Sequence, residues 1–367
     1  MKKVIITVIV LVIVILLGWW FFLRETGRPG VERVPSGSPF GSGVDGQVDS
    51  REQIVESEEN FIPSSSLSGE GTKLFQISNT PVAGFVALIN SVRYVDRAAG
   101  HIYQFNPATL ERTKITNQTL PKIYEAQFRA DGDAVLLRYL RNGSDTVENL
   151  SLVLTPPTST STTLHRVTST LLRGYAGPVA INSPFTNWAF SLGNKVVAYT
   201  KPSSGVPGYA YTVANGNLSK ILGPLNGLMV TTNNVGNRVA YSYVEDGTTK
   251  LFSKNLTSGN ISEILPATLA EKCVWSTKYI NEVYCGAPTD NIRSNEPDNW
   301  YQGETHFSDR LWRFDTDSEI AEILIEPKSS LSIDIDVYQP KLSPNEDYLI
   351  FINKNDLSLW VLKLENI

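Results

Sequence analysis

The sequence predicts an all-β protein, a six-bladed β-propeller built from four-stranded blades. Three observations support this prediction. Short alternating strands recur with a period near 43 residues, and most of the repeats contain four such strands. The last repeat lacks a fourth strand, which a segment before the first repeat could supply. Four strands in about 40–45 residues is the usual length of a propeller blade.

The repeat is clearest in the second strand of each unit, where a short apolar run follows a turn. The second residues of these runs are separated by 43, 61, 43, 44 and 66 residues, and they are Val92, Val135, Val196, Val239, Val283 and Leu349. Turns such as Asp131-Gly132 and Gly236-Asn237 precede five of the runs. Because Gly and Asn accept the positive φ of tight turns, each run is expected to pair with the strand before it as a hairpin.

Third strands follow in all six repeats and fourth strands in five. The third strands are expected at 101–107, 148–154, 209–215, 250–256, 310–316 and 357–364, and the fourth at 111–116, 163–167, 218–222, 261–265 and 319–324. The last repeat ends after its third strand, at Leu364, whereas Thr72–Ser78 resembles the other fourth strands. We predict that Thr72–Ser78 completes the last blade, because an open array would leave strand edges unpaired.

The repeat phrase KLSPNEDYLIFINKNDLSLWVLKL, residues 341–364, resembles the blades of TolB-type and WD-repeat-like bacterial propellers. Segments 272–276, 284–288 and 300–312 also resemble uncharacterised bacterial membrane propellers with a single anchor. The resemblance implies the architecture and supplies no reaction. TolB has an additional N-terminal α/β domain, and an apolar segment and a linker stand in its place here.

The chain begins with a candidate membrane anchor at residues 1–23. Lys2 and Lys3 precede the apolar run Val4–Leu23, and Trp19 and Trp20 lie near its end. About 20 apolar residues span roughly 30 Å as a helix, the thickness of the bilayer core. A cleaved signal peptide is the alternative, but the run exceeds the usual h-region of about 7–15 residues and no small-residue cleavage site follows.

Residues 24–71 are predicted to be a flexible linker, and residues 72–367 the propeller. The linker is rich in Gly, Ser and Pro and then acidic, without apolar periodicity. Its Gly41-Ser-Gly43-Val-Asp-Gly46 matches a dinucleotide fingerprint but lacks the required strand and helix context. Charged residues flank both ends of the anchor, so the positive-inside rule only weakly favours a propeller on the extracytoplasmic side.

The chain has two cysteines, Cys273 and Cys285, placed symmetrically about Tyr279 on the first two strands of the fifth blade. If the two strands form a hairpin, the cysteines oppose each other at a distance suited to a disulfide. A disulfide would favour an oxidising, extracytoplasmic compartment. The alternative is two buried apolar thiols.

The longest insertion, Gly286–Asp309, joins the second and third strands of the fifth blade. It carries Arg293, Trp300, Tyr301, His306 and Asp309. Exposed aromatic side chains beside polar groups suit sugar or peptide recognition, so these five residues are the candidate binding face. The competing interpretation, which is preferred, is that Trp300 and Tyr301 fold back over the blade edge. Loops 201–208 and 141–146 are expected on the same face, and the second insertion, Thr155–Thr163, is expected to be a surface loop.

The sequence contains no recognisable catalytic, cofactor or metal motif in the predicted propeller. Its histidines, His101, His165 and His306, lie in different repeats. Asp334 and Asp336 alternate along a strand, as a general acid and base could, but a solvated edge is the preferred interpretation. A net charge of −5 disfavours nucleic-acid binding, which requires a basic surface.

Three functions are therefore considered. The leading hypothesis is a non-enzymatic propeller, without a cofactor, that is held at the cell membrane by a single span and binds a protein partner of an envelope or surface assembly. The second is a carbohydrate- or peptide-binding module that uses the 286–309 loop. The third is an enzyme that acts on cell-wall polymer from a central funnel.

Overall fold

The computed structural model describes residues 73–117, 119–141, 146–156, 166–172, 188–192, 195–214, 217–293 and 295–364, with the backbone alone for 166–172 and 192. The predicted anchor (1–23), the predicted linker (24–71), His165 and most of the insertion 155–163 therefore lie outside the described residues. Within the described ranges, no helix is both long enough and apolar enough to cross a membrane.

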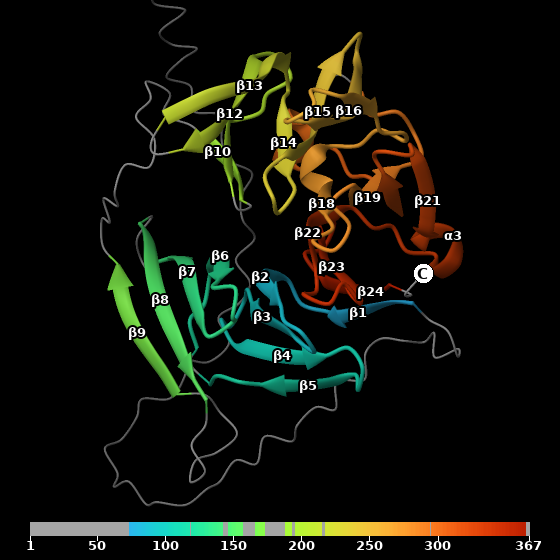
Figure 1. Ribbon diagram of the computed structural model, residues 1–367. Helices are drawn as coiled ribbons and strands as arrows, with labels where there is room; N and C mark the ends of the chain where they lie inside the picture. Colours follow the sequence, from blue (N-terminus) through green and yellow to red (C-terminus); the bar gives the residue numbers. More distant parts are fainter. Residues whose placement is uncertain are drawn as a thin grey trace, which may run out of the picture. The chain divides into compact units, whose positions relative to one another are not determined.

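The described strands form six four-stranded antiparallel sheets, shown in chain colours in Figure 1. In chain order the first three consist of β2 (Val82–Ala87), β3 (Val92–Asp96), β4 (Ile102–Asn106) and β5 (Glu111–Lys114); β6 (Ile123–Phe128), β7 (Ala134–Leu140), β8 (Val147–Thr155) and β9 (Arg166–Leu172); and β10 (Trp188–Leu192), β11 (Val196–Thr200), β12 (Pro207–Ala214) and β13 (Asn217–Asn226).

The other three consist of β14 (Met229–Thr232), β15 (Arg238–Glu245), β16 (Thr248–Asn255) and β17 (Ile261–Glu263); β18 (Cys273–Trp275), β19 (Glu282–Pro288), β20 (Asp309–Asp315) and β21 (Ile320–Ile325); and β22 (Val337–Leu342), β23 (Tyr348–Asn353), β24 (Leu359–Lys363) and β1 (Leu74–Ser78). The described residues also form three short helices, η1 (Ala270–Lys272), α2 (Asp298–Gln302) and α3 (Pro327–Leu331).

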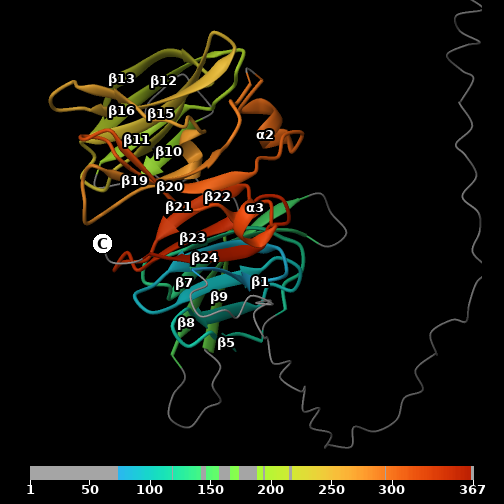
Figure 2. The same cartoon turned by 90° about the vertical axis from the view of Figure 1, so that its right-hand side faces the viewer.

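The last sheet is completed from the start of the described chain, as the repeat predicted. Leu74 pairs with Leu362 and Phe75 with Val361, so β1 lies antiparallel beside β24 (Figure 2). Leu74 and Ile77 are almost completely buried. Strand β1 therefore contributes apolar packing as well as the backbone hydrogen bonds of a fourth strand.

The predicted second and third strands are confirmed in all six sheets, but one predicted fourth strand is displaced. Strand β9 begins at Arg166, three residues after the predicted start at Thr163, and it runs to Leu172. The reason is the length of its nine-residue partner, because β8 pairs with β9 over seven residues, from Asn149 opposite Leu172 to Thr155 opposite Arg166.

The core lies between consecutive sheets, whose first strands contact one another in the order β6, β2, β22, β18, β14 and β10. One apolar cluster joins Phe85 and Tyr94 of the β2–β5 sheet to Ile350 and Val361 of the last sheet. A close approach occurs at Gly84, where an added Cβ would lie 1.9 Å from the carbonyl oxygen of Ala126 on β6. Because glycine has no Cβ, the backbones of β2 and β6 can come closer here than any other residue would allow.

Candidate functional site

The 286–309 insertion is fastened to the sheets beneath it by helix α2, and this overturns part of the predicted binding face. Trp300 has no exposed surface. Its indole Nε1 donates to both carboxylate oxygens of Asp336, at 3.1 and 3.0 Å, and its ring packs edge-on against Tyr338 at 5.9 Å. Trp300 therefore folds back into the core, as the preferred interpretation held, and offers no surface to a ligand.

Asp309 is also buried, and it belongs to a cluster of charged side chains that the sequence did not reveal. The Nζ of Lys272 lies 2.8 Å from Oδ2 of Asp309 and 2.6 Å from Oδ1 of Asp336, and none of the three side chains is exposed. Asp309 Oδ2 also accepts the backbone N–H of Val337, whereas Oδ1 has no partner among the described atoms. Burial raises the pKa of Asp309 to about 6, partly opposed by Lys272. The preferred interpretation of Asp336 as a solvated residue was wrong.

Tyr301, which follows Trp300 in α2, remains partly exposed, at 38%. Its hydroxyl donates to Oε1 of Glu271 at 2.6 Å, and the Tyr199 hydroxyl donates to the same oxygen at 3.2 Å. Burial raises the pKa of Glu271, and the two tyrosine hydroxyls partly offset this effect. The two bonds connect the insertion to strand β11 and to helix η1.

Further contacts fix the insertion on this side of the sheets. The carboxylate of Asp298 accepts Ser204 N–H and Ser204 Oγ, both at 2.6 Å, and this places loop 201–208 on the same face, as predicted. Residues 142–145 of the other predicted loop lie outside the described residues. Lys354 Nζ donates to the carbonyl oxygen of Trp300 at 2.6 Å. The insertion is thus held by hydrogen bonds against the loops at this end of the sheets.

Arg293 and His306, the other two residues of the predicted binding face, are exposed. Arg293 pairs through its backbone with Thr248 of β16 in an isolated bridge. His306 lies near the end of the insertion and borders a cavity described below. The structure therefore does not gather the five predicted residues into one site, because two are buried and the remaining three are dispersed.

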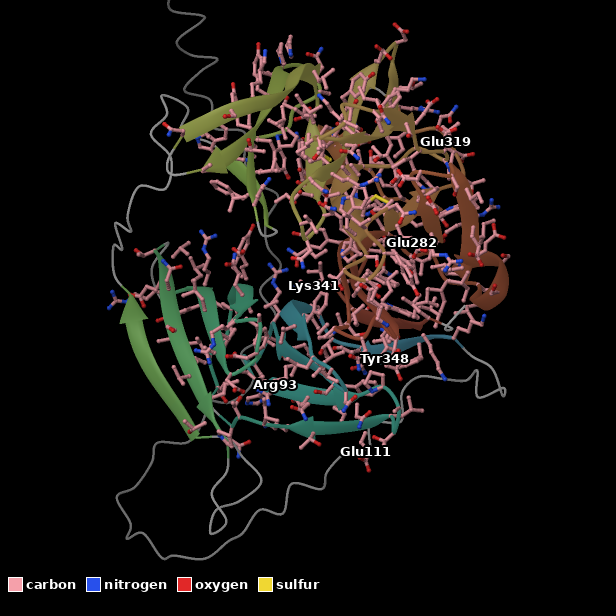
Figure 3. All side chains as sticks on the ribbon, in the orientation of Figure 1. Arg93, Glu111, Glu282, Glu319, Lys341 and Tyr348 are labelled. Carbon is pink, nitrogen blue, oxygen red and sulfur yellow. A yellow bond between two sulfur atoms is a disulfide. The ribbon has the colours of Figure 1, made fainter. Side chains whose placement is uncertain are left out.

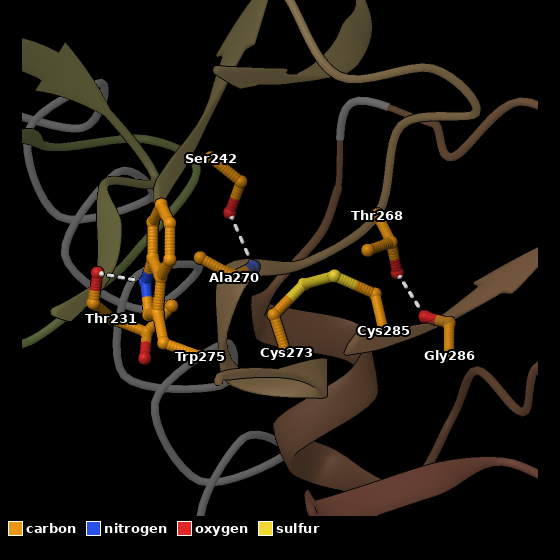
Figure 4. Close-up of a disulfide and its surroundings, with 8 residues drawn as sticks. All are labelled: Thr231, Ser242, Thr268, Ala270, Cys273, Trp275, Cys285 and Gly286. Carbon is orange, nitrogen blue, oxygen red and sulfur yellow. Dashed lines mark hydrogen bonds between the residues drawn. A yellow bond between two sulfur atoms is a disulfide. The ribbon is translucent and has the colours of Figure 1, made fainter. Parts of the chain in front are cut away.

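Cys273 and Cys285 are directly opposite each other on β18 and β19 and form a disulfide, with their Cα atoms 4.1 Å apart. Figure 4 shows the disulfide beside Trp275, whose Nε1 donates to the carbonyl oxygen of Thr231. Thr268 Oγ1 also donates to the carbonyl oxygen of Gly286 at 2.7 Å. The disulfide thus joins the first two strands of the fifth sheet, and the second of them, β19, leads into the insertion.

The largest of the described cavities, the mouth pocket, lies where the β2, β6 and β22 strands begin. It has a volume of about 580 Å³. Its charged lining consists of Arg97, Glu125, Lys354 and Asp356, and its aromatic lining of Tyr124 and Tyr338. A cavity of this size with convergent polar groups is the default candidate for a binding site.

Each of the three strands that open into the mouth pocket has a bulge near its start. The pairing registers shift between Val82 and Gly84, between Ile123 and Glu125, and between Tyr338 and Lys341. The first strands of the other three sheets pair without a shift. The bulges place Ala83, Tyr124 and Gln339 at the pocket, and Gln339 has a positive φ of 50°. Bulges re-aim side chains beside functional sites.

The charged groups of the mouth pocket differ in how fully they are bonded. Glu125 accepts Arg138 Nη1 at 2.8 Å and Gln127 Nε2 at 2.6 Å. Arg97 donates its Nε to the carbonyl oxygen of Ile123 at 3.2 Å, and its guanidinium lies over the Tyr124 ring at 5.4 Å. The two terminal nitrogens of Arg97 have no acceptor within the described part of the chain. Tyr124 is 69% exposed.

Farther along β22, Lys341 connects two sheets (Figure 3). Its Nζ donates to the carbonyl oxygen of Phe85 at 2.8 Å and lies 4.7 Å from the Phe85 ring centre. The side chain remains accessible to solvent, but protein atoms surround it, and this partial desolvation lowers its pKa to about 8.

A second cavity of about 470 Å³ adjoins the mouth pocket, because Asn355 lines both. Its lining includes His306, Phe307, Lys328 and Asp334. Asp334 accepts Ser308 Oγ at 2.6 Å and lies 3.0 Å from Lys328 Nζ, and these two bonds lower its pKa. Within the described residues, no group of three or more His, Cys, Asp or Glu side chains could hold a metal ion.

One residue signalled the mouth pocket in the sequence, although the prediction did not use it. Pro340 interrupts the first strand of the last repeat, and a proline inside a strand marks an edge or a bulge. No comparable signal marks Lys272, Asp309 or Asp336, which come from three separate segments and meet only through the packing of the last two sheets.

No protein-family model matches the sequence, and no curated protein matches it. Among solved structures, the chain is similar to TolB from Acinetobacter baumannii, with a TM-score of 0.37, 16% identity and coverage of 66% of this chain and 54% of that one. It is also similar to a putative TolB from Agrobacterium tumefaciens, with a TM-score of 0.41, 10% identity and coverage of 80% and 97%. A third is the β-propeller domain of Cps50 (Swd1) from Myceliophteria thermophila, with a TM-score of 0.43, 8% identity and coverage of 80% and 100%. The chain thus spans about half the length of the first of these proteins.

Proposed function

We propose that this chain is a single-pass membrane protein whose propeller lies on the extracytoplasmic side and binds a protein partner of an envelope or surface assembly. The binding site is the mouth pocket. The observation that carries this proposal is the set of three bulged strands that open into one polar cavity, with Tyr124 exposed at its rim. The function needs no catalytic group or cofactor.

The propeller in this proposal has six blades in a closed ring, with β1 as the closing strand. The six described sheets and the contacts between their first strands support this arrangement. The extracytoplasmic location is supported by the Cys273–Cys285 disulfide, because such bonds persist in oxidising compartments. The membrane attachment is supported by the apolar run Val4–Leu23.

Site-specific photo-cross-linking tests the proposal in the full-length protein in its native membrane. A photoreactive amino acid at Tyr124 should give a discrete adduct with one partner. The same amino acid at Val235 is the matched control, because Val235 is 48% exposed and lies in the hairpin turn between β14 and β15, at the opposite end of the first strands. An adduct at Val235 and none at Tyr124 would refute a partner site at the mouth pocket.

A second candidate function is carbohydrate or peptide binding by the 286–309 loop itself. The exposed His306 and the partly exposed Tyr301 favour it, whereas the burial of Trp300 removes its strongest stacking surface. Binding to a glycan array that is lost in Tyr301→Ala would support this function, and an array without signal would count against it.

A further inference from the structure

We propose that the mouth pocket recognises the free C-terminal carboxylate of its partner, with Arg97 as the anchoring residue, and that the partner's last residues extend across Asn355 into the second cavity. This inference rests on the proposed function and adds the chemistry of the partner segment.

The first step of the argument is the state of Arg97. Its Nε is bonded to the carbonyl oxygen of Ile123, and its plane is supported by the Tyr124 ring, so the guanidinium is held in place. Arg97 lines the cavity, and its terminal nitrogens remain without acceptors among the described residues. A guanidinium with two parallel N–H donors matches a carboxylate in a bidentate pair. Because the Tyr124 ring already holds the Arg97 side chain in place, the side chain would lose less conformational entropy when such a pair forms.

The second step is the charge around Arg97. The carboxylates that border the pocket are Glu125 and Asp356, and both already accept hydrogen bonds. Glu125 is paired with Arg138, and Asp356 Oδ1 accepts the N–H and Oγ of Ser358 at 2.9 and 2.5 Å. Neither carboxylate is paired with Arg97 among the described residues, so the charge of its guanidinium remains for a ligand to neutralise.

The third step distinguishes a peptide from an acidic sugar. The remaining lining of the mouth pocket includes Val82, Ala83, Ile352 and Leu357, which are aliphatic. Sugars bind to open aromatic faces, and Arg97 lies over one face of the Tyr124 ring. A carboxylate beside an aliphatic wall fits the last residue of a peptide with a Val, Ile or Leu side chain. Asn355 lines both cavities, so the preceding residues can extend across it towards the second cavity, where Phe307 is part of the lining.

The test uses the full-length chain in nanodiscs and two immobilised hexapeptide libraries that end in Val or Leu. One library has a free C-terminal carboxylate and the other a carboxamide. We expect the best acid peptides to bind at least tenfold more tightly than their own amides. In Arg97→Gln this difference should disappear through weaker binding of the acid, while the affinity for the amide stays unchanged.

Two further variants serve as controls. Arg129→Gln changes an exposed arginine that pairs with Asp131 in the turn before β7, and it should keep the full preference for the acid. Tyr124→Ala removes the ring under Arg97 from an exposed position, so it should fold normally and reduce the preference. It also provides a second measurement if Arg97→Gln does not fold.

Equal affinity for acid and amide peptides would overturn the inference. Binding of oligogalacturonate, a carboxylated sugar polymer, in place of the peptides would overturn the peptide assignment. If no peptide binds but the cross-link at Tyr124 still forms in membranes, the inference fails while the proposed function stands. If the cross-link is absent too, both fail.

Discussion

Lys272 and Asp336 form an ion pair of 2.6 Å between Nζ and Oδ1, with neither side chain exposed to solvent. Lys272 ends helix η1, just before the fifth sheet, and Asp336 precedes the first strand of the sixth. The same aspartate holds the indole of Trp300, so this one carboxylate joins two sheets and the insertion above them. Three segments that are far apart in the sequence thus meet at one cluster of buried charges, in which Lys272 also pairs with Asp309.

We predict that Lys272→Met destabilises the fold by about 3–5 kcal/mol, because removing one partner of a buried ion pair leaves the other charges uncompensated. Urea denaturation of the full-length protein measures the change. Lys328→Met is the matched control, since the Lys328–Asp334 pair has a similar length of 3.0 Å but is 67% and 56% exposed. It should cost about 0–1 kcal/mol. Equal losses in the two variants would contradict a special role for the buried pair.

The raised pKa of Asp309 predicts a specific dependence of stability on pH. Its folded-state pKa of about 6 lies above the ordinary value of 3.8, so the folded protein binds more protons than the unfolded chain between these pH values. The contribution of Asp309 to stability therefore increases as the pH falls from about 6 towards 4, and it is lost as the pH rises through 6.

The difference in unfolding free energy between wild type and Asp309→Asn measures this contribution, because titrating groups outside the Lys272–Asp309–Asp336 cluster cancel in the difference. We expect the unfolding free energy of the wild type, relative to that of the variant, to increase as the pH falls from 7 to 4.5. A difference that stays constant with pH would show that Asp309 does not titrate in this range.

The disulfide predicts a redox-dependent stability. Its two cysteines are 12 residues apart, and a bridge that closes a loop of this length is worth roughly 3 kcal/mol in the chain-entropy treatment. Dithiothreitol should therefore lower the melting temperature of the wild type. The Cys273→Ser/Cys285→Ser variant should melt at the lower temperature under both conditions. If the wild type is first unfolded in the presence of dithiothreitol so that the disulfide is reduced, and its melting temperature after refolding is unchanged, this prediction is contradicted.

Strand β1 predicts that the two ends of the described region fold together. Leu74→Ala and Ile77→Ala should each cost about 2–5 kcal/mol, because both side chains are buried against the last sheet. Deleting residues 72–78 should destabilise all six sheets, as measured by circular dichroism and urea denaturation. Deleting residues 30–60, before this strand, should leave the transition unchanged.

Gly84 predicts a steric limit at the contact between β2 and β6. Gly84→Ala would bring a methyl group to 1.9 Å from the carbonyl oxygen of Ala126, so the two strands must separate and the variant should lose several kcal/mol. Gly205→Ala is the control, because nothing lies within 4 Å of its added Cβ. Its melting temperature should match that of the wild type.

Local pattern was sufficient to predict the strands of this protein and the way the last sheet is completed. Alternating apolar residues and turn chemistry act within a few positions along the chain, so repeats such as 341–364 specify their own hairpins. The opposition of Cys273 and Cys285 follows from the same local pairing. The displaced start of β9 shows the limit of this reasoning, because the long partner strand β8 decides its register.

Packing between sheets decided the rest. In the sequence, Trp300 and Tyr301 are both aromatic residues of one loop. In the structure, Trp300 is buried with its indole bonded to Asp336, whereas Tyr301 is partly exposed with its hydroxyl bonded to Glu271. Asp309 and Lys272 become one buried cluster only when the fifth and sixth sheets meet. The mouth pocket exists because bulges on three strands from separate repeats face the same space. Such contacts depend on how close distant segments of the chain lie in the folded protein. Local sequence patterns do not specify these distances.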